Sequence, residues 1–305
     1  MIYNVPSSYD TSDNAARFVK ECDDSFSLKL SEATKRILEQ KDVKVITLSG
    51  PTCSGKTTAS KRFLSDFEKH SKRVNIISID DFYYDKDYLV NLSKEKGMDS
   101  VDFDSIDTID ISALKSVIDE IFDSKKAYVH CPVFDFVEGK RTSYRTLECT
   151  ENDIFLFEGI QALYPEIHDL LDDHEYCDVF ICPQSTLKIG NVTFLPNELR
   201  LLRRLVRDSN FRGASPQFTF EIWQNVRKNE ELNIFPYSSI CEIKIDSVFP
   251  CELSLLKPYL EKILPTIPDD SEYYNASIDI LNKIKFIEPL SKDYLSEDSI
   301  YREFI

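Results

Sequence analysis

Two kinds of hydrophobic pattern alternate along this chain. Short runs rich in Val, Ile, Leu and Phe predict buried strands, and they span 43–49, 74–79, 128–133, 153–157, 178–182 and 242–245. Between them, apolar residues recur every three or four positions, which predicts helices over 28–40, 57–69, 108–122, 162–171, 197–208, 217–229 and 253–264. Because such alternation forms right-handed βαβ units, we predict an α/β fold: a mostly parallel sheet flanked by helices, with a site at the carboxyl ends of its strands.

One long segment lacks a clear pattern. Residues 85–107 are polar, acidic and only weakly periodic. A stretch of this length without an obvious element is either a mobile insertion or a flap beside a substrate. We keep both interpretations.

The composition excludes several classes of protein. The chain has 305 residues with 53 Asp and Glu against 37 Lys and Arg, a formal net charge of −16. This charge repels nucleic acids and anionic membranes unless cations are locally concentrated. Because 42% of the residues are hydrophobic, we expect a folded core. There is no leader pattern and no apolar run near the roughly 18 residues of a membrane helix, so we predict a cytoplasmic protein.

Cysteine and histidine give no sign of a metal site. The eight cysteines include no Cys-x-x-Cys pair, and the four histidines form no cluster with ligand spacing. We therefore expect reduced, mostly buried cysteines and no metal site built from these two residue types.

A phosphate-binding motif follows the first of these strands. Residues 50–57, Gly-Pro-Thr-Cys-Ser-Gly-Lys-Thr, match G-x-x-x-x-G-K-[ST] between a predicted strand and a predicted helix. In such a loop the backbone N–H groups bind the β-phosphate, Lys56 reaches the β- and γ-oxygens and Thr57 binds Mg²⁺. The predicted nucleotide-binding residues are Gly50, Thr52, Cys53, Ser54, Gly55, Lys56, Thr57 and Thr58. A glycine turn that binds nothing is the alternative.

Two acids stand at the ends of predicted strands. Asp80 follows the run 74–79 and Glu158 follows 153–157. A small-molecule kinase needs a carboxylate near the acceptor hydroxyl and an acid near the metal. We therefore predict that Asp80 is the general base and that Glu158 holds the water shell of Mg²⁺. The alternatives are an N-cap for Asp80 and a plain strand-end acid for Glu158. A GTPase is set aside because the Asn-Lys pair at 282–283 lacks the Asp of Asn-Lys-x-Asp.

Arginines gather on one predicted helix. Arg200, Arg203, Arg204 and Arg207 are spaced i, i+3, i+4 and i+7 and so share a helical face, and Arg212 follows them. Without matched acids four residues away, these cations repel one another unless an anion binds. We predict an arginine-rich lid helix whose guanidinium groups contact the phosphates of ATP. A solvated charged face is the alternative.

Six ordered motifs resemble the uridine kinase/phosphoribulokinase family of P-loop kinases. They are the phosphate loop, Asp80-Asp81-Phe82-Tyr83, Pro132-Val133-Phe134-Asp135-Phe136, Phe157-Glu158-Gly159-Ile160, the run from Arg203 to Asp208, and Arg212-Gly213. The likeness is closest to the kinase half of bacterial nucleoside kinases that carry an N-terminal TGS-type domain, and it runs from about residue 20 onward. It implies an enzyme that uses ATP and Mg²⁺ to phosphorylate the 5′-hydroxyl of a nucleoside or a comparable primary alcohol. It also implies catalytic roles for Asp80, Lys56, Arg203 and Arg207, and ATP contacts for Arg204 and Arg212.

The resemblance also suggests how the chain is divided. Residues 1–40 are expected to form a helical extension and residues 41–265 a P-loop kinase domain with its lid at about 196–230. Residues 266–305 are expected to form a helical tail packed on that domain.

The acceptor is less defined than the nucleotide. Tyr83, Asp104, Phe136 and Arg141 fall where uridine kinases contact the nucleoside, and Arg200 of the lid is a further candidate. Uridine and cytidine kinases resemble Tyr-Asp-Phe-x-x-His-x-Arg, in which the Tyr and the His contact the base, whereas Phe134 and Gly139 stand at those two positions here. We predict uridine or cytidine as the acceptor. Another small sugar or polyol, a non-catalytic ATP-binding switch and a homo-oligomer stay open.

Overall fold

A five-stranded parallel sheet forms the centre of the computed structural model, which describes residues 1–98, 101–123 and 125–305. The strand order is β10-β7-β2-β6-β3, and every neighbouring pair is parallel. The strands are β2 (Val45–Ser49), β3 (Val74–Ser78), β6 (Ile154–Glu158), β7 (Tyr176–Cys182) and β10 (Ile243–Asp246). All five residues of the central strand β2 are buried, as expected for a parallel strand covered on both faces. The predicted α/β fold is confirmed.

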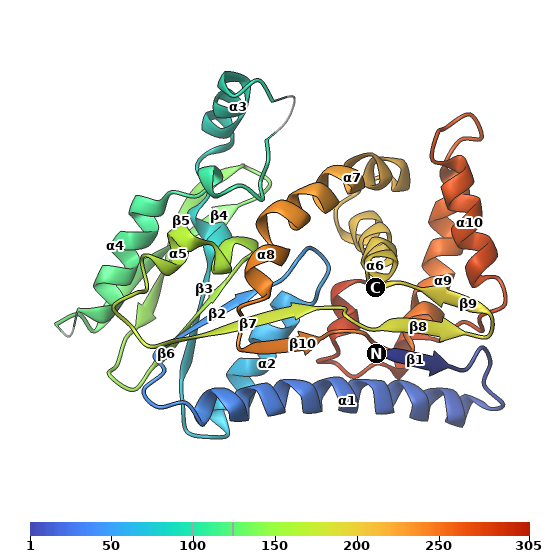
Figure 1. Ribbon diagram of the computed structural model, residues 1–305, viewed down its shortest axis with the longest axis horizontal. Helices are drawn as coiled ribbons and strands as arrows, with labels where there is room; N and C mark the ends of the chain where they lie inside the picture. The colour runs from blue at the N-terminus through green and yellow to red at the C-terminus, as the bar shows by residue number, and fades with distance from the viewer. Residues whose placement is uncertain (99–100, 124) are drawn as a thin grey trace.

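Helices cover both faces of this sheet (Figure 1). The α-helices are α1 (Ser12–Leu38), α2 (Lys56–Glu68), α3 (Lys86–Glu95), α4 (Ile111–Phe122), α5 (Pro165–His168), α6 (Pro196–Phe211), α7 (Pro216–Asn233), α8 (Phe235–Ser238), α9 (Glu252–Ile263) and α10 (Tyr274–Ile284). Short 3₁₀ turns are η1 (Ile79–Phe82), η2 (Ile106–Thr108), η3 (Ile160–Leu163), η4 (Leu264–Thr266), η5 (Lys292–Tyr294) and η6 (Ile300–Glu303). Among the described residues, no helix combines the length and the apolar character needed to cross a membrane.

The alternation of side chains along each strand divides the core in two. On β6, Ile154 and Leu156 pack into one cluster with α1, α2, α6 and α9, whereas Phe155 and Phe157 pack into another with η1, α4 and β4 (Tyr128–Asp135). The last residues of the chain, Ile300, Tyr301 and Phe304, belong to the first cluster. The segment around η6 is therefore built into the core that carries the phosphate loop.

Two smaller sheets adjoin the main one. Strands β1 (Ile2–Val5), β8 (Thr186–Ile189) and β9 (Val192–Phe194) form one, and β4 forms an antiparallel hairpin with β5 (Lys140–Glu148). The sequence pattern predicts none of β1, β5, β8 and β9. Strand β5 escapes prediction because it is mostly exposed and lacks an apolar run. The segment 85–107 contains α3 and η2, while its residues 99 and 100 lie outside the described part of the chain.

The prediction of a single helix over 162–171 is wrong. The chain forms η3 and then starts α5 at Pro165. Proline has no N–H to donate inside a helix but is well suited to its first position. A continuous helix therefore cannot run through residue 165, and a new helix begins there instead. The helix expected over 28–40, by contrast, is longer than predicted and begins at Ser12, capped by the Thr11 side chain.

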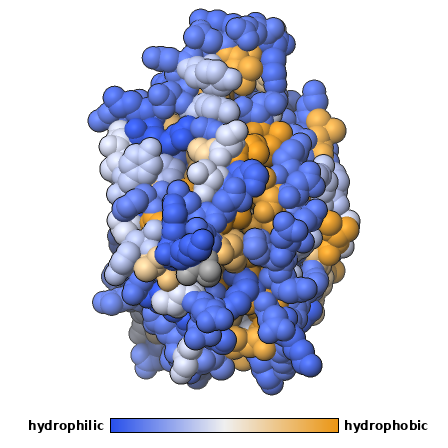
Figure 2. Space-filling model, turned by 90° about the vertical axis from the view of Figure 1, so that its left-hand side faces the viewer, coloured by the Kyte–Doolittle hydropathy of each residue, from blue (hydrophilic) through white to orange (hydrophobic). Residues whose placement is uncertain are grey.

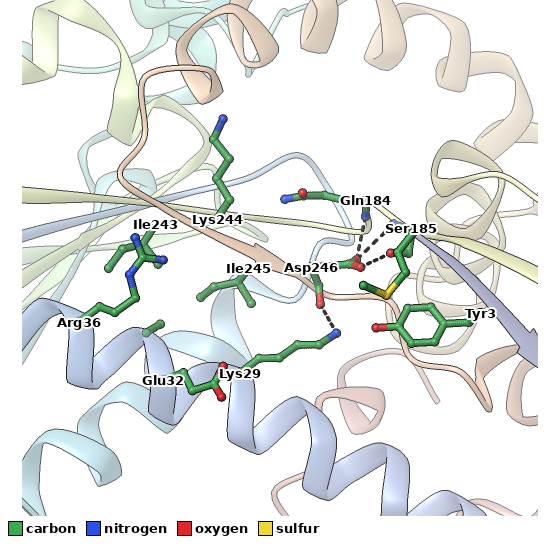
Figure 3. A pocket seen from close by; sticks show the side chains of 12 residues that line it. Tyr3, Lys29, Glu32, Arg36, Gln184, Ser185, Ile243, Lys244, Ile245 and Asp246 are labelled. Atoms are coloured by element: carbon green, nitrogen blue, oxygen red, sulfur yellow. Dashed lines mark hydrogen bonds between the residues drawn. The ribbon is translucent and has the colours of Figure 1, made fainter.

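Helix α1 covers the β10 edge of the sheet. Lys29 donates to the carbonyl of Asp246 at 2.8 Å, and Arg36 donates to the carbonyl of Glu242 at 2.8 Å. A pocket of about 400 Å³ lies between this helix and β10. Figure 3 shows that Asp246 bonds Ser185 and Gln184 inside it. None of the predicted site residues lines this pocket.

We expect Phe67→Ala to lower the free energy of unfolding by about 3–5 kcal/mol, because the ring is fully buried between α2 and the sheet. Phe286, which is 78% exposed, supplies the matched control, and Phe286→Ala should change it by less than about 0.5 kcal/mol. Equilibrium denaturation of both variants checks this, and equal effects would contradict the core assignment.

Candidate active site

The phosphate loop contains two residues with a left-handed backbone. It joins β2 to α2, with Gly55 at φ +93° as the N-cap residue and Cys53 at φ +56°. A Cβ on Gly50 would collide with the backbone carbonyl of Ile181 on β7. Only glycine therefore fits at both motif positions, one because of its close approach to β7 and the other because of its left-handed backbone.

Two polar side chains of the loop show how it could receive an anion. Lys56 folds back and donates to the carbonyl of Gly50 at 2.7 Å. The hydroxyl of Ser54 is buried and has no hydrogen-bond partner among the described residues. Buried polar atoms are rarely left unpaired, so a ligand oxygen such as that of a phosphate fits this position.

Asp80 and Glu158 meet at the carboxyl ends of β3 and β6. Glu158 pairs in register with Leu48 of β2 and Ser78 of β3, and Asp80 lies two residues further along, inside η1 rather than at its N-cap. One carboxylate oxygen of Asp80 is buried without a partner among the described residues. The neighbouring carboxylate of Asp81 accepts from the N–H of Phe134 at 3.1 Å and so fastens η1 to the hairpin.

Burial is the main influence on the pKa values of Asp80 and Glu158. It raises the pKa of Glu158 to about 7, with Asp80 acting in the same direction and Lys56 against it. Burial likewise raises the pKa of Asp80, and the charges of Lys56 and Arg212 oppose that rise. Carboxylates this short of counter-charge favour the approach of a cation. No three His, Cys, Asp or Glu side chains of the described residues are grouped to hold a metal ion by themselves.

Two of the predicted lid arginines lie behind the loop instead of facing a ligand. Arg200 is fully buried and makes a bidentate pair with Glu230 of α7 at 2.5 and 2.6 Å. Arg203 is fully buried and makes a bidentate pair with Glu252 of α9 at 2.7 and 3.1 Å. Neither guanidinium is exposed in this structure, and the expected contacts of Arg200 with the acceptor and of Arg203 with the transferring phosphoryl group stay predictions.

These arginines instead bond the loop. Arg200 donates to the carbonyl of Thr52 at 3.2 Å, and Arg203 donates to the carbonyl of Cys53 at 3.3 Å. The guanidinium of Arg203 also lies over the rings of Tyr301 and Phe304, at 5.3 and 5.4 Å. Both residues are therefore positioning residues for the phosphate loop.

The other three arginines surround one buried carboxylate. Asp208 accepts from Arg204 at 3.1 Å and from Arg207 at 2.9 Å, and lies 3.6 Å from Arg212. This corrects the expectation of a stripe without matched acids, since Asp208 follows Arg204 by four residues. Three guanidinium groups still share a single carboxylate, so the cluster keeps an excess of positive charge. The side chain of Arg212 is 59% exposed.

Aromatic side chains form a cluster around Tyr83, which directly follows η1. The ring of Tyr83 meets Phe103, Phe134 and Phe136 edge to face, with centroids 5.6, 5.7 and 6.3 Å apart. Tyr83 is buried and packs as a core residue, whereas Phe136 is 66% exposed at the end of β4. Figure 2 views the molecule from the left-hand side of Figure 1, the side that carries α3 and α4, where a narrow apolar band crosses a mostly hydrophilic surface.

Three side chains hold the segment around Asp104 in place. Tyr83 and Gln161 each donate to the carbonyl of Phe103 at 2.9 Å, and Tyr164 donates to that of Asp104 at 2.9 Å. Asn229 of α7 donates to the carboxylate of Asp102 at 2.7 Å. The sequence pattern does not identify Gln161, Tyr164, Asp102 or Asn229, because each acts through a residue far away along the chain.

The carboxylate of Asp104 accepts no hydrogen bond from the part of the chain that the structure describes. Burial raises its pKa to about 6, with Asp102 and Glu230 acting in the same direction and Lys56 and Arg204 against it. Asp104 and Asp80 thus both lie within electrostatic reach of Lys56.

The side chain of Arg141 is already engaged in an ion pair. It donates to Asp110 at 2.8 Å, and Asp110 also caps α4. Gly139, two residues earlier, has φ +68°, and its carbonyl accepts from the N–H of Lys86 at 2.7 Å. A Cβ at residue 139 would lie 2.7 Å from the Cβ of Lys86, so α3 occupies the space that a larger residue would need.

Known proteins resemble this chain in sequence. A uridine kinase of Lactobacillus helveticus is 28% identical over 172 residues, 56% of this chain and 70% of that protein. A uridine kinase of Staphylococcus carnosus is 29% identical over 184 residues, 60% of this chain and 76% of that protein. Uridine-cytidine kinase C of Dictyostelium discoideum is 26% identical over 223 residues, 72% of this chain and 42% of that protein.

The fold has a counterpart among solved structures. A structure from Silicibacter sp. TM1040, described as a candidate fructose transport system kinase, matches with a TM-score of 0.50 at 17% identity. The match covers 70% of this chain and 98% of that one, and at this identity the likeness concerns the fold alone.

Residues 45–253 match the family described as Phosphoribulokinase / Uridine kinase family. This range covers more than half of the 305 residues and contains the phosphate loop, the strand-end acids and the arginines of α6. The chain therefore belongs to the phosphoribulokinase/uridine kinase family and is a P-loop small-molecule kinase.

Proposed function

We propose that this enzyme transfers the γ-phosphoryl group of ATP to the 5′-hydroxyl of a pyrimidine nucleoside, uridine or cytidine. The observation that carries the proposal is the placement of Asp80 and Asp104. The charge of Lys56 acts on both carboxylates. Each carboxylate is also close in the chain to a ring of one aromatic pair, Asp80 to Tyr83 and Asp104 to Phe103. One of them can serve the reacting hydroxyl, and the other can hold the remaining hydroxyls of the sugar.

The phosphate side follows from the loop. Backbone N–H groups of residues 52–55, the hydroxyls of Ser54 and Thr58, and the side chain of Lys56 bind the phosphates of ATP in this proposal. Thr57 and Glu158 are the residues that would hold Mg²⁺, which neutralises charge on the phosphate oxygens when bound. Arg204, Arg207 and Arg212 then stabilise the charge on the transferred group.

Asp80 takes the proton in this reaction. The acceptor oxygen forms a bond to the γ-phosphorus, the bond from that phosphorus to the β–γ bridging oxygen breaks, and ADP leaves with the electron pair. The hydroxyl proton passes to the unpartnered oxygen of Asp80. Its raised pKa makes this carboxylate a stronger base, and the charge of Lys56 favours its ionised form.

The nucleoside fits the acceptor side in two ways. An ionised Asp104 can accept hydrogen bonds from two ribose hydroxyls, and the exposed ring of Phe136 offers a surface on which a base can stack. Relatives named uridine kinase match over much of their length, which favours a nucleoside over other alcohols.

A sugar or polyol is the second candidate. At Gly139 and Phe134 the chain lacks the polar side chains that would hydrogen-bond a base. A site without such groups discriminates weakly between acceptors. A coupled ADP-release screen over nucleosides, sugars and polyols separates the two candidates, since only the first predicts turnover that requires a base.

Replacing the proposed base should remove turnover while nucleotide binding persists. For Asp80→Asn we expect kcat to fall by roughly 10²- to 10⁴-fold because the amide cannot take the proton. Asp81→Asn is a matched control, because its side-chain oxygen can still accept from Phe134, and its kcat should stay within several-fold of the parent. An equal loss in both variants, in a coupled ADP assay with nucleotide affinity measured in parallel, would speak against Asp80 as the base.

The stacking surface should affect the acceptor alone. We expect Phe136→Ala to raise the KM for the nucleoside about tenfold and leave the KM for ATP unchanged. The ring is largely exposed, so folding should not suffer. Val137→Ala, at a residue that is 96% exposed, is the control. If the KM for ATP rose as much as the KM for the nucleoside, the ring of Phe136 would not belong to the acceptor site.

Acceptor binding should weaken in acid. Asp104, whose pKa is about 6, is ionised above that pH and protonated below it, and only the ionised form accepts hydrogen bonds from both hydroxyls. We therefore expect the acceptor KM to rise as the pH falls below 6, and this rise should vanish in Asp104→Asn. Since the pKa of Asp104 in the folded protein lies above the ordinary value of 3.8 for an aspartate, the stability that its protonated form contributes is lost as the pH rises through 6. A flat profile for the parent enzyme would contradict the role.

A further inference from the structure

The segment 299–305 lies directly against the phosphate loop. The side chain of Ile300 occupies the space beside Gly55 where a Cβ would collide with it. The hydroxyl of Thr58, in the first turn of α2, donates to the carboxylate of Glu303 at 3.0 Å. Asn210 of α6 donates to the carbonyl of Phe304 at 3.3 Å, and Figure 1 shows the C-terminus beside this helix.

Buried contacts on both sides keep Glu303 in this place. Tyr301 and Phe304 are fully buried. The ring of Tyr301 stacks on Phe249 with centroids 4.6 Å apart, and its hydroxyl bonds Glu252 and Arg203. Because Arg203 also bonds the carbonyl of Cys53, the segment and the phosphate loop form one packed unit, from which Glu303 cannot easily withdraw.

The beginning of α2 lacks an anion of its own. It has no acidic residue in its first turn, and Gly55 provides no side-chain cap. The free N–H groups and the dipole at such a helix start attract negative charge. In this structure the carboxylate of Glu303 reaches that first turn from the other end of the chain.

Other groups of the site also experience this charge. Burial is the main cause of the raised pKa of Glu158, and Glu303 adds to it. Burial lowers the pKa of Arg207, but anionic neighbours that include Glu303 raise it overall. An anion at this position therefore acts on the acid proposed for the metal and on an arginine proposed for the phosphoryl group.

We propose that Glu303 is a determinant of nucleotide affinity: its carboxylate competes with the nucleotide phosphates for the Thr58 hydroxyl and the first turn of α2. The inference rests on the proposed function, because it requires ATP and ADP to occupy the loop. A like charge near the phosphates weakens the binding of both nucleotides and so promotes the release of ADP.

The test measures the affinity of the full chain for ADP and for a non-hydrolysable ATP analogue, with Mg²⁺, by titration calorimetry. Glu303→Gln keeps a side-chain oxygen for Thr58 but removes the charge, and we expect nucleotide to bind about five- to tenfold more tightly. Glu297→Gln makes the same charge change at an exposed residue that precedes η6, and it should bind within twofold of the parent. The gain from Glu303→Gln should shrink at high salt.

Unchanged or weaker binding in Glu303→Gln would overturn the inference, since weaker binding would mean that the charge supports the loop. Glu303→Ala provides a second variant, and it too must tighten binding. Lys56→Ala separates the two proposals. If the parent binds no nucleotide, or Lys56→Ala binds as well as the parent, the proposed function fails; if Lys56→Ala loses binding and Glu303→Gln matches the parent, only the role of Glu303 fails.

Discussion

Two buried arginine–glutamate pairs hold the phosphate loop, and the rest of the site depends on them. Arg200 with Glu230 and Arg203 with Glu252 join α6 to α7 and to α9, and each arginine has a donor left for a loop carbonyl. Buried pairs of this kind add little net stability over apolar packing, but losing one partner costs about 3–5 kcal/mol because a charge is left uncompensated. Their contribution here is to position the phosphate loop, because each arginine also donates a hydrogen bond to one of its carbonyls.

The same pairs explain how a chain of net charge −16 can bind an anion. Glu230 of α7 and Glu252 of α9 neutralise Arg200 and Arg203. These two arginines therefore do not repel the other arginines of α6. The three arginines around Asp208 keep a surplus of positive charge. Arg212 acts on the pKa of Asp80 and Arg204 on that of Asp104. A low-dielectric interior strengthens this local balance relative to distant surface charge. Local arrangement therefore outweighs the overall charge.

How far the sequence could predict this site depends on the range of the contacts involved. The phosphate loop, the strand-end acids and the parallel sheet follow from local pattern, because their residues are adjacent or regularly spaced in sequence. The partners of Arg200 and Arg203 lie 30 and 49 residues away, and helical spacing carries no information about them. The exposed strand β5 gives no apolar signal. The contact of Glu303 with Thr58 joins residues 245 positions apart, which only the folded chain can show.

The contact between Gly139 and Lys86 limits the mutational routes open to this enzyme. A single substitution that places histidine at residue 139 would meet both a left-handed backbone and the side chain of Lys86. A base-contacting side chain could enter only after α3 had shifted or shortened. The side chain that residue 139 can carry is therefore coupled to the position of α3.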